Sequence, residues 1–182
     1  MSEEQKYIRI APGEYYVSDQ DVLISTVLGS CVAICLYDPI RKVIGMNHIM
    51  LSREQSGVEC EEDRGKSGIC AMELLIADML KMGAFLQNLR AKAFGGASMF
   101  KPYNECFVSY CVGEENVRFA KNFLKTNDIP LVAEDLGGER GRVIYFSWRD
   151  FSVRVKTMKK VANSKVICND DTSWEKLRSR GL

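Results

Sequence analysis

Hydrophobic residues in the first third of the chain form three short runs that predict neighbouring β-strands. Residues 22–26 have β-type composition, and residues 32–37 are apolar nearly throughout. A short continuous apolar run is typical of a strand buried on both faces. Residues 43–50 form the third run, and the Asp-Pro pair in residues 38–42 favours a turn before it. We therefore expect the second and third runs to form a hairpin.

An amphipathic helix is predicted in the middle of the chain, where six apolar residues recur at helical spacing. Ser67 is its expected N-cap, and Gly83 is the expected stop at its C-terminus. The preceding residues 52–66 are polar and acidic, and they predict a mobile loop. The apolar positions are Ile69, Met72, Leu75, Ile76, Met79 and Leu80.

The second half of the chain predicts further strands and a second helix. Residues 89–94 form a strand pattern that runs into Gly95 and Gly96, and two adjacent glycines allow backbone to approach either a neighbouring strand or a ligand closely. Residues 107–112 predict a short strand, and Asn116 is the expected N-cap of the second helix. Other strand-like runs are residues 131–133, 142–148 and 152–156, the last two forming a hairpin.

This order of elements predicts an α+β fold, a layered sandwich of mixed β-sheet or two stacked sheets flanked by helices. The chain has 182 residues, enough to bury a sizeable core in one domain. We expect that domain over residues 1–157. Residues 158–182 are polar and irregular, and they predict a partly ordered C-terminal tail.

Charge and hydropathy exclude several classes of partner. The net charge of +1 gives no broad field that would favour nucleic acid or an anionic membrane. No apolar run reaches the roughly 18 residues that a membrane-spanning helix needs, so no membrane insertion is expected. The N-terminal residues are polar and lack the apolar stretch of a signal peptide, which predicts a cytoplasmic protein.

Seven cysteines and a single histidine are the residues with the richest chemistry. In a cytoplasmic chain we expect reduced thiols, most of them small buried apolar residues, Cys35 included. The nearest cysteine pairs, Cys31/Cys35 and Cys106/Cys111, do not have the Cys-x-x-Cys spacing of zinc sites. No metal and no other cofactor is therefore expected.

Cys31 and His48 are the candidate reactive pair. Cys31 follows a glycine turn at the start of the second apolar run, and His48 lies in the third, so the predicted hairpin brings them within reach of each other. A thiol and an imidazole act together as nucleophile and base. Two other interpretations remain: both side chains are structural, or the cysteines form a thiol redox sensor.

Five motifs occur in order and together resemble the CheD family of chemoreceptor glutamine deamidases over about residues 10–156. They are LGSCVA (28–33), NHIML (47–51), KAFGGASMF (92–100), GEEN (113–116), and DLGG with GR (135–138 and 141–142). After the second motif Ser52 replaces the family's usual proline, a change at the rim of the site.

The resemblance implies a Cys-His-Thr/Ser triad on a layered fold shared with cysteine-hydrolase deamidase toxins. Cys31 would be the nucleophile and His48 the base. The third member of the family's triad lies six residues before the cysteine, which selects Ser25. Strand neighbours face opposite sides, so either Ser25 or Thr26 points at His48, and we expect Ser25. The expected substrate-binding rim includes Ser30, Asn47, Gly95 and Gly96, within an open cleft edged by residues 52–66 and 95–103.

The same resemblance implies hydrolysis of specific glutamine side chains to glutamate in the cytoplasmic helical bundle of chemoreceptors, through a thioester. A glutamyl methyl ester is chemically similar, so weak methylesterase activity is also expected. The implied partners are the receptor and a CheC-type phosphatase, and a monomer is expected. The alternative function is a non-catalytic adaptor that docks such a phosphatase.

Overall fold

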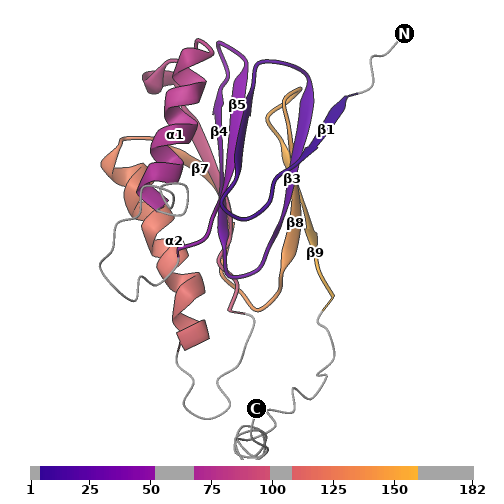
Figure 1. Ribbon diagram of the computed structural model, residues 1–182, viewed down its shortest axis with the longest axis vertical. Coiled ribbons are helices and arrows are strands. Elements are labelled where there is room, and N and C mark those ends of the chain that lie inside the picture. Colours follow the sequence, from indigo (N-terminus) through magenta and orange to yellow (C-terminus); the bar gives the residue numbers. More distant parts are fainter. Residues whose placement is uncertain (1–4, 52–67, 99–107, 160–182) are drawn as a thin grey trace, which may run out of the picture.

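The protein is a three-layered α+β sandwich, as the sequence predicts. The computed structural model describes residues 5–51, 68–98 and 108–159. Two β-sheets stack face to face, and two helices cover the outer face of one of them (Figure 1). The layers are therefore helices, a five-stranded sheet and a four-stranded sheet.

The five-stranded sheet is the middle layer, with β4 at its centre. β4 runs antiparallel to both β5 and β6, and β6 runs parallel to β7. The strands, in spatial order, are β2 (Tyr15–Ser18), β5 (Val43–Ile49), β4 (Val32–Asp38), β6 (Arg90–Gly95) and β7 (Leu131–Leu136). The helices are α1 (Gly68–Lys81), the short 3-10 helix η2 (Leu86–Asn88) and α2 (Val108–Thr126).

The four-stranded sheet is built on β3, which runs parallel to β1 and antiparallel to β8. Its strands, in spatial order, are β1 (Lys6–Arg9), β3 (Val22–Leu28), β8 (Arg142–Ser147) and β9 (Val153–Thr157). The antiparallel pairing of β8 with β9 confirms the predicted closing hairpin. The first twenty residues, from which no strand is predicted, contribute β1 and β2.

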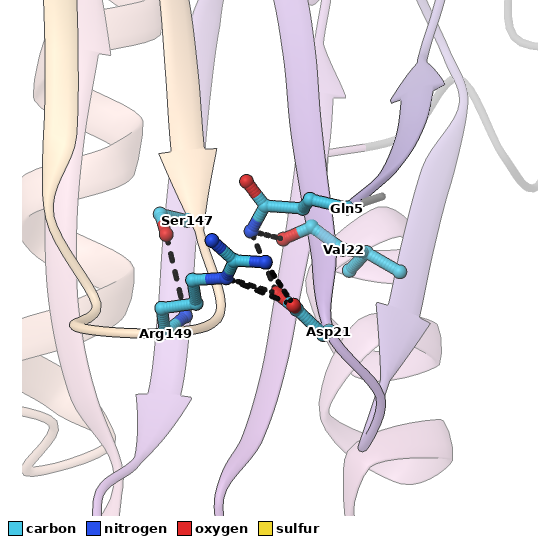
Figure 2. A network of polar contacts seen from close by, with 5 residues as sticks. All are labelled: Gln5, Asp21, Val22, Ser147 and Arg149. Atoms are coloured by element: carbon cyan, nitrogen blue, oxygen red, sulfur yellow. Dashed lines mark hydrogen bonds and ion pairs between the residues drawn. The ribbon is translucent and has the colours of Figure 1, made fainter. Parts of the chain in front are cut away.

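A network of polar contacts joins the residues that flank β1, β3 and β8 at one edge of the four-stranded sheet (Figure 2). The carboxylate of Asp21, just before β3, pairs with the guanidinium of Arg149, just after β8, at 2.7 Å. The side-chain amide of Gln5 donates to the same carboxylate at 2.8 Å. The hydrogen bond from Arg149 lowers the pKa of Asp21.

The central strand β4 is buried on both faces, which confirms the prediction from its continuous apolar run. Val32, Ile34 and Leu36 belong to the core between this sheet and the helices. Ala33 and Cys35 belong to the second core, between the two sheets. Cys35 is thus the core residue that the sequence predicts.

The first helix confirms part of its predicted face. Met72, Leu75 and Met79 are fully buried, whereas Ile69 and Leu80 are 53% and 40% exposed. The predicted stop is confirmed, because the N–H of Gly83 donates to the carbonyl of Leu80 at 2.9 Å beyond the last helical turn.

Two predictions about the second helix are wrong. Residues 108–112 belong to α2 and not to a strand, and Asn116 lies in the middle of the helix instead of capping it. A polar residue within an apolar face is typical of a helix start, because asparagine is disfavoured inside helices unless its side chain has partners. Asn116 has two partners, described below.

Several expectations concern residues outside the described ranges. They are the N-cap Ser67, the loop over residues 52–66, the rim residues 99–103 and the tail beyond Lys159. The domain boundary at residue 157 likewise stays a prediction. Within the described part of the chain, no helix has the length and apolar character needed to span a membrane.

Candidate functional site

The candidate reactive pair lies on one face of the five-stranded sheet. His48 on β5 is paired with Ala33 on β4, and paired residues of antiparallel strands project to the same side. Cys31 lies two positions before Ala33 and packs against the core between the sheets. Cys31 therefore stands immediately before β4, at the end of the ladder that pairs β4 with β5. The predicted hairpin thus places Cys31 and His48 on the same side.

Thr26 contacts the imidazole from the opposite sheet. Its Oγ1 lies 2.7 Å from Nδ1 of His48 and 2.9 Å from the carbonyl oxygen of Ile10. The carbonyl can only accept, so the Thr26 hydroxyl donates to Ile10 and must accept from His48. Nδ1 therefore carries the proton, and Nε2 keeps its lone pair. The two contacts set the tautomer that a general base needs.

The expectation that Ser25 faces the imidazole is wrong. Its Oγ donates to the hydroxyl of Tyr7 at 2.6 Å, on the other face of the four-stranded sheet. Successive strand residues project to opposite faces, and the buried apolar residues Val22, Ile24 and Leu28 show which face of β3 is inward. Thr26 belongs to that even-numbered series. Both sets of alternate positions in β3 carry apolar residues, so the sequence alone does not select Thr26, and the burial of the strand does.

Burial keeps the reactive pair uncharged at rest. His48 is 2% exposed, and desolvation lowers its pKa to about 4. Burial raises the pKa of the Cys31 thiol. Within the described residues, Nε2 of His48 is a buried polar atom without a hydrogen-bond partner. Such atoms are rare in folded proteins and often mark a functional site. The arrangement is a neutral thiol near a neutral imidazole whose basic nitrogen is free.

The glycine pair at the end of β6, Gly95 and Gly96, supports the backbone at Cys31. The N–H of Gly96 donates to the carbonyl of Cys31 at 2.7 Å, and the N–H of Ala97 donates to the carbonyl of Gly29 at 2.8 Å. Gly95 has a φ of +109°, and a Cβ there would collide with the carbonyl oxygen of Cys31. Of the two roles weighed for this glycine pair, close approach to a neighbouring strand is the one observed.

The expected rim residues are mostly internal. Gly95 and Gly96 are buried. Asn47 is 1% exposed; its Oδ1 accepts the N–H of Ile34 on β4 at 3.1 Å, and its Nδ2 donates to the carbonyl of Ala71 on α1 at 3.5 Å. Placing Asn47, Gly95 and Gly96 on a substrate rim is therefore wrong for the described structure. Neighbouring strand residues face opposite ways, so Asn47 and His48 cannot both face the site. Ser30 remains partly exposed beside Cys31.

Another motif of the resemblance has a structural explanation. The guanidinium of Arg142 is buried and pairs with the carboxylate of Asp135 at 2.7 Å. It also donates to the carbonyls of Asp135 and Gly137. These contacts hold the connection between β7 and β8. Among the described residues, no group of three or more His, Cys, Asp or Glu side chains is placed to hold a metal ion.

Comparison with known proteins identifies relatives along most of the chain. A family model described as "CheD chemotactic sensory transduction" matches residues 50–157. A Geobacter sulfurreducens protein named "Probable chemoreceptor glutamine deamidase CheD 1" is 47% identical over 176 residues, covering 95% of this chain and 88% of the relative. A protein of Herminiimonas arsenicoxydans, named "Probable chemoreceptor glutamine deamidase CheD", is 40% identical over 96% of this chain and 84% of its own length.

Solved structures are more distant. The Bacillus licheniformis hypothetical protein YfiH matches with a TM-score of 0.42 and 12% identity, over 73% of this chain and 60% of YfiH, less than two thirds of that protein. Nothing about activity follows from similarity at this level. The sequence relatives and the family model, which matches more than half of the residues, agree with each other, and the chain therefore belongs to the CheD family.

Proposed function

We propose that this protein hydrolyses the side-chain amides of specific glutamines in chemoreceptors to glutamate. The observation that carries the proposal is the buried imidazole of His48, which Thr26 holds with Nε2 free on the sheet face that also presents Cys31. The relatives' printed names give the substrate class, chemoreceptor glutamine. Action on the cytoplasmic part of the receptor, and hence a cytoplasmic location, is part of the proposal.

The proposed reaction proceeds in two stages. In the first, Sγ of Cys31 attacks the carboxamide carbon while Nε2 of His48 takes the thiol proton. His48 returns this proton to the departing nitrogen, so ammonia leaves and a thioester remains. In the second, His48 takes a proton from water, whose oxygen attacks the thioester; the proton returns to sulfur, and glutamate is released. The net change is one water consumed and one ammonia released.

The neutral resting pair is suited to this sequence. Because burial lowers the pKa of His48 to about 4, the imidazole stays available as a base well below neutral pH. Burial also raises the pKa of Cys31, so the thiolate forms during attack rather than beforehand. Hydrogen bonds in unliganded sites are often longer than in the substrate complex, and we expect the thiol and imidazole to approach when substrate binds.

A glutamyl methyl ester presents a similar carbonyl, so weak methylesterase activity belongs to the same proposal. A monomer that also docks a CheC-type phosphatase is compatible with it. A purely non-catalytic adaptor is less well supported, because such a module gains nothing from a buried imidazole with an unpartnered Nε2.

The direct test is intact-mass analysis of a chemoreceptor cytoplasmic fragment from the same organism, incubated with the full-length protein. Exchange of NH2 for OH adds about one dalton at each glutamine that is hydrolysed. We expect stepwise mass increases at a few glutamines, located by peptide sequencing. A fragment with those glutamines replaced by glutamate is the control and should show no change. Receptors whose mass stays constant would contradict the proposal.

Replacing Thr26 with valine is expected to slow deamidation by about 10- to 100-fold. The variant keeps the shape but leaves Nδ1 of His48 without its acceptor, and a buried group left unpaired costs about 1–3 kcal/mol. The imidazole tautomer is then no longer fixed. The rate of mass increase measures the effect.

The matched control is Ser25→Ala, which removes the neighbouring hydroxyl on the other face of the same strand. Because Ser25 bonds to Tyr7, this variant should retain the wild-type rate within about twofold. A larger loss in Ser25→Ala than in Thr26→Val would show that the hydroxyl roles are reversed.

A further inference from the structure

Asn116 joins the two backbone segments that flank the candidate reactive pair. It lies within α2 and is 0% exposed. Its Nδ2 donates to the carbonyl of Ser30 at 2.9 Å, and its Oδ1 accepts the N–H of Leu51 at 3.0 Å. Ser30 immediately precedes Cys31, and Leu51 follows β5, the strand that carries His48. One side-chain amide thus bridges the entry to β4 and the exit from β5.

The first of these bonds also fixes the direction of a peptide group. In a trans peptide the C=O and the N–H point in opposite directions, and no described peptide bond is cis. The carbonyl of Ser30 points to α2, on the helix side of the sheet. The N–H of Cys31, in the same peptide, therefore points away from the helices, toward the face where the thiol and His48 lie.

The neighbouring carbonyls are held as well. As described above, those of Gly29 and Cys31 accept hydrogen bonds from Ala97 and Gly96. α2 approaches this glycine pair closely at Gly113, where a Cβ would lie 2.8 Å from the carbonyl oxygen of Gly96. Rotation of the Ser30–Cys31 peptide would leave Nδ2 of Asn116, a fully buried side chain, without this acceptor. The scaffold therefore opposes that rotation.

We propose that Asn116 is a positioning residue that holds the N–H of Cys31 toward the site, where this N–H stabilises the oxyanion formed when sulfur adds to the amide carbon. The inference rests on the proposed deamidation. Preorganised backbone N–H donors are effective at this step because they need no rearrangement as charge develops. The N–H of Cys31 also interacts with the sulfur of the same residue, and this interaction lowers the pKa of the thiol while desolvation raises it.

Replacing Asn116 with alanine should lower kcat for receptor deamidation by about 10- to 100-fold and change KM little, since the lost interaction forms in the transition state. The matched control is Leu124→Ala, which removes a buried side chain two turns further along α2. We expect that control to lower the melting temperature while keeping kcat within about twofold. Both variants are assayed at a temperature where circular dichroism shows them folded.

Asn116→Asp tests the donor separately and keeps the side chain's shape. An ionised carboxylate accepts the N–H of Leu51 but cannot donate to Ser30, whereas a protonated carboxyl group can do both. Activity of this variant should approach that of the wild type at about pH 5 and fall as the carboxyl group ionises. The wild type should show no such fall. A pH profile of Asn116→Asp parallel to that of the wild type would overturn the proposal.

Alkylation of Cys31 by iodoacetamide, followed on its own peptide by mass spectrometry, gives a readout that needs no receptor. In Asn116→Ala the reaction should require higher pH than in the wild type, because the thiolate loses an aligned N–H, while Leu124→Ala should match the wild type. If receptors are not deamidated but alkylation in Asn116→Ala does require higher pH, the proposed deamidation fails, while the orientation of the Cys31 N–H by Asn116 is supported. An Asn116→Ala variant with the wild-type kcat and the wild-type pH dependence of alkylation would overturn the proposal that Asn116 positions this N–H.

Discussion

Replacing Cys31 with alanine is expected to abolish receptor deamidation, with a loss on the order of 10⁴-fold or more. Cys31 is the partly exposed thiol on that face of the sheet, whereas Cys35 is fully buried, and without the Cys31 thiol no thioester can form. Measurement is by intact mass of the receptor fragment over a long incubation. Serine at this position should be almost as inactive, because its hydroxyl is a far weaker nucleophile than a thiol near neutral pH.

Cys35→Ala is the matched control for that variant. Cys35 follows on the same face of the strand but is fully buried between the sheets, where desolvation strongly raises its pKa. Its loss removes one small apolar side chain from the core and leaves the reactive pair in place. We expect somewhat lower stability with the rate kept within about twofold. Deamidation by Cys31→Ala at the wild-type rate would remove this thiol from the mechanism.

Replacing His48 with glutamine is expected to reduce the rate by about 10²- to 10⁴-fold, the usual contribution of a general base. Glutamine can still hydrogen-bond to Thr26 but cannot carry a proton between sulfur, nitrogen and water. The steady-state rate of ammonia release measures the loss. A glutamine variant with the full rate would show that another group acts as the base.

The pH profile of the wild type separates this base from an ordinary exposed histidine. With the pKa of His48 at about 4, kcat/KM at pH 5.5 should stay within about twofold of its value at pH 7.5. A histidine with the usual pKa of about 6.5 would retain roughly a tenth. An acid limb centred near pH 6.5 would contradict a desolvated imidazole in the free enzyme.

The same buried histidine makes folding depend on pH in a defined direction. Below about pH 6.5 the unfolded chain binds a proton on His48, whereas the folded chain resists it until about pH 4. The unfolded state therefore binds more protons in this window, so stability falls as pH falls, by up to about 1.4 kcal/mol per pH unit from this group. The free energy of unfolding is measured with denaturant for the wild type and His48→Gln, each at pH 7 and pH 4.5. The wild type should lose more stability than the variant on acidification, and the difference between the two losses is the contribution of His48, because the other titrating groups are common to both proteins.

The local sequence pattern predicts much of the fold, because burying one face of a helix or strand gives its hydrophobic residues a characteristic spacing along the chain. The apolar run over residues 32–37 predicts a strand buried on both faces, and β4 is the central strand of the middle layer. The same pattern misplaced the start of α2, since Asn116 interrupts its apolar face. A buried asparagine cannot be told from a helix cap until its partners are known, and those partners, Ser30 and Leu51, are remote in sequence.

The third member of the candidate site shows the same limit. Resemblance to a family selected Ser25 by counting residues, whereas the inward face of β3 carries Thr26. The contact from Thr26 to His48 joins two different sheets. Which hydroxyl meets the imidazole depends on how the sheets face each other, and the sequence of β3, with apolar residues at both sets of alternate positions, does not show which of its faces is inward.

The amino-acid sequence by itself determined that one hairpin carries the imidazole on one strand and the thiol at the start of the other, because a short turn between two apolar runs leaves little freedom in their pairing. The tertiary structure decided the rest. It brought Thr26 across from the other sheet, set the imidazole tautomer, and directed the Ser30–Cys31 peptide through Asn116. These contacts join segments that are distant along the chain, so they depend on the packing of whole layers and not on the pattern of any one segment.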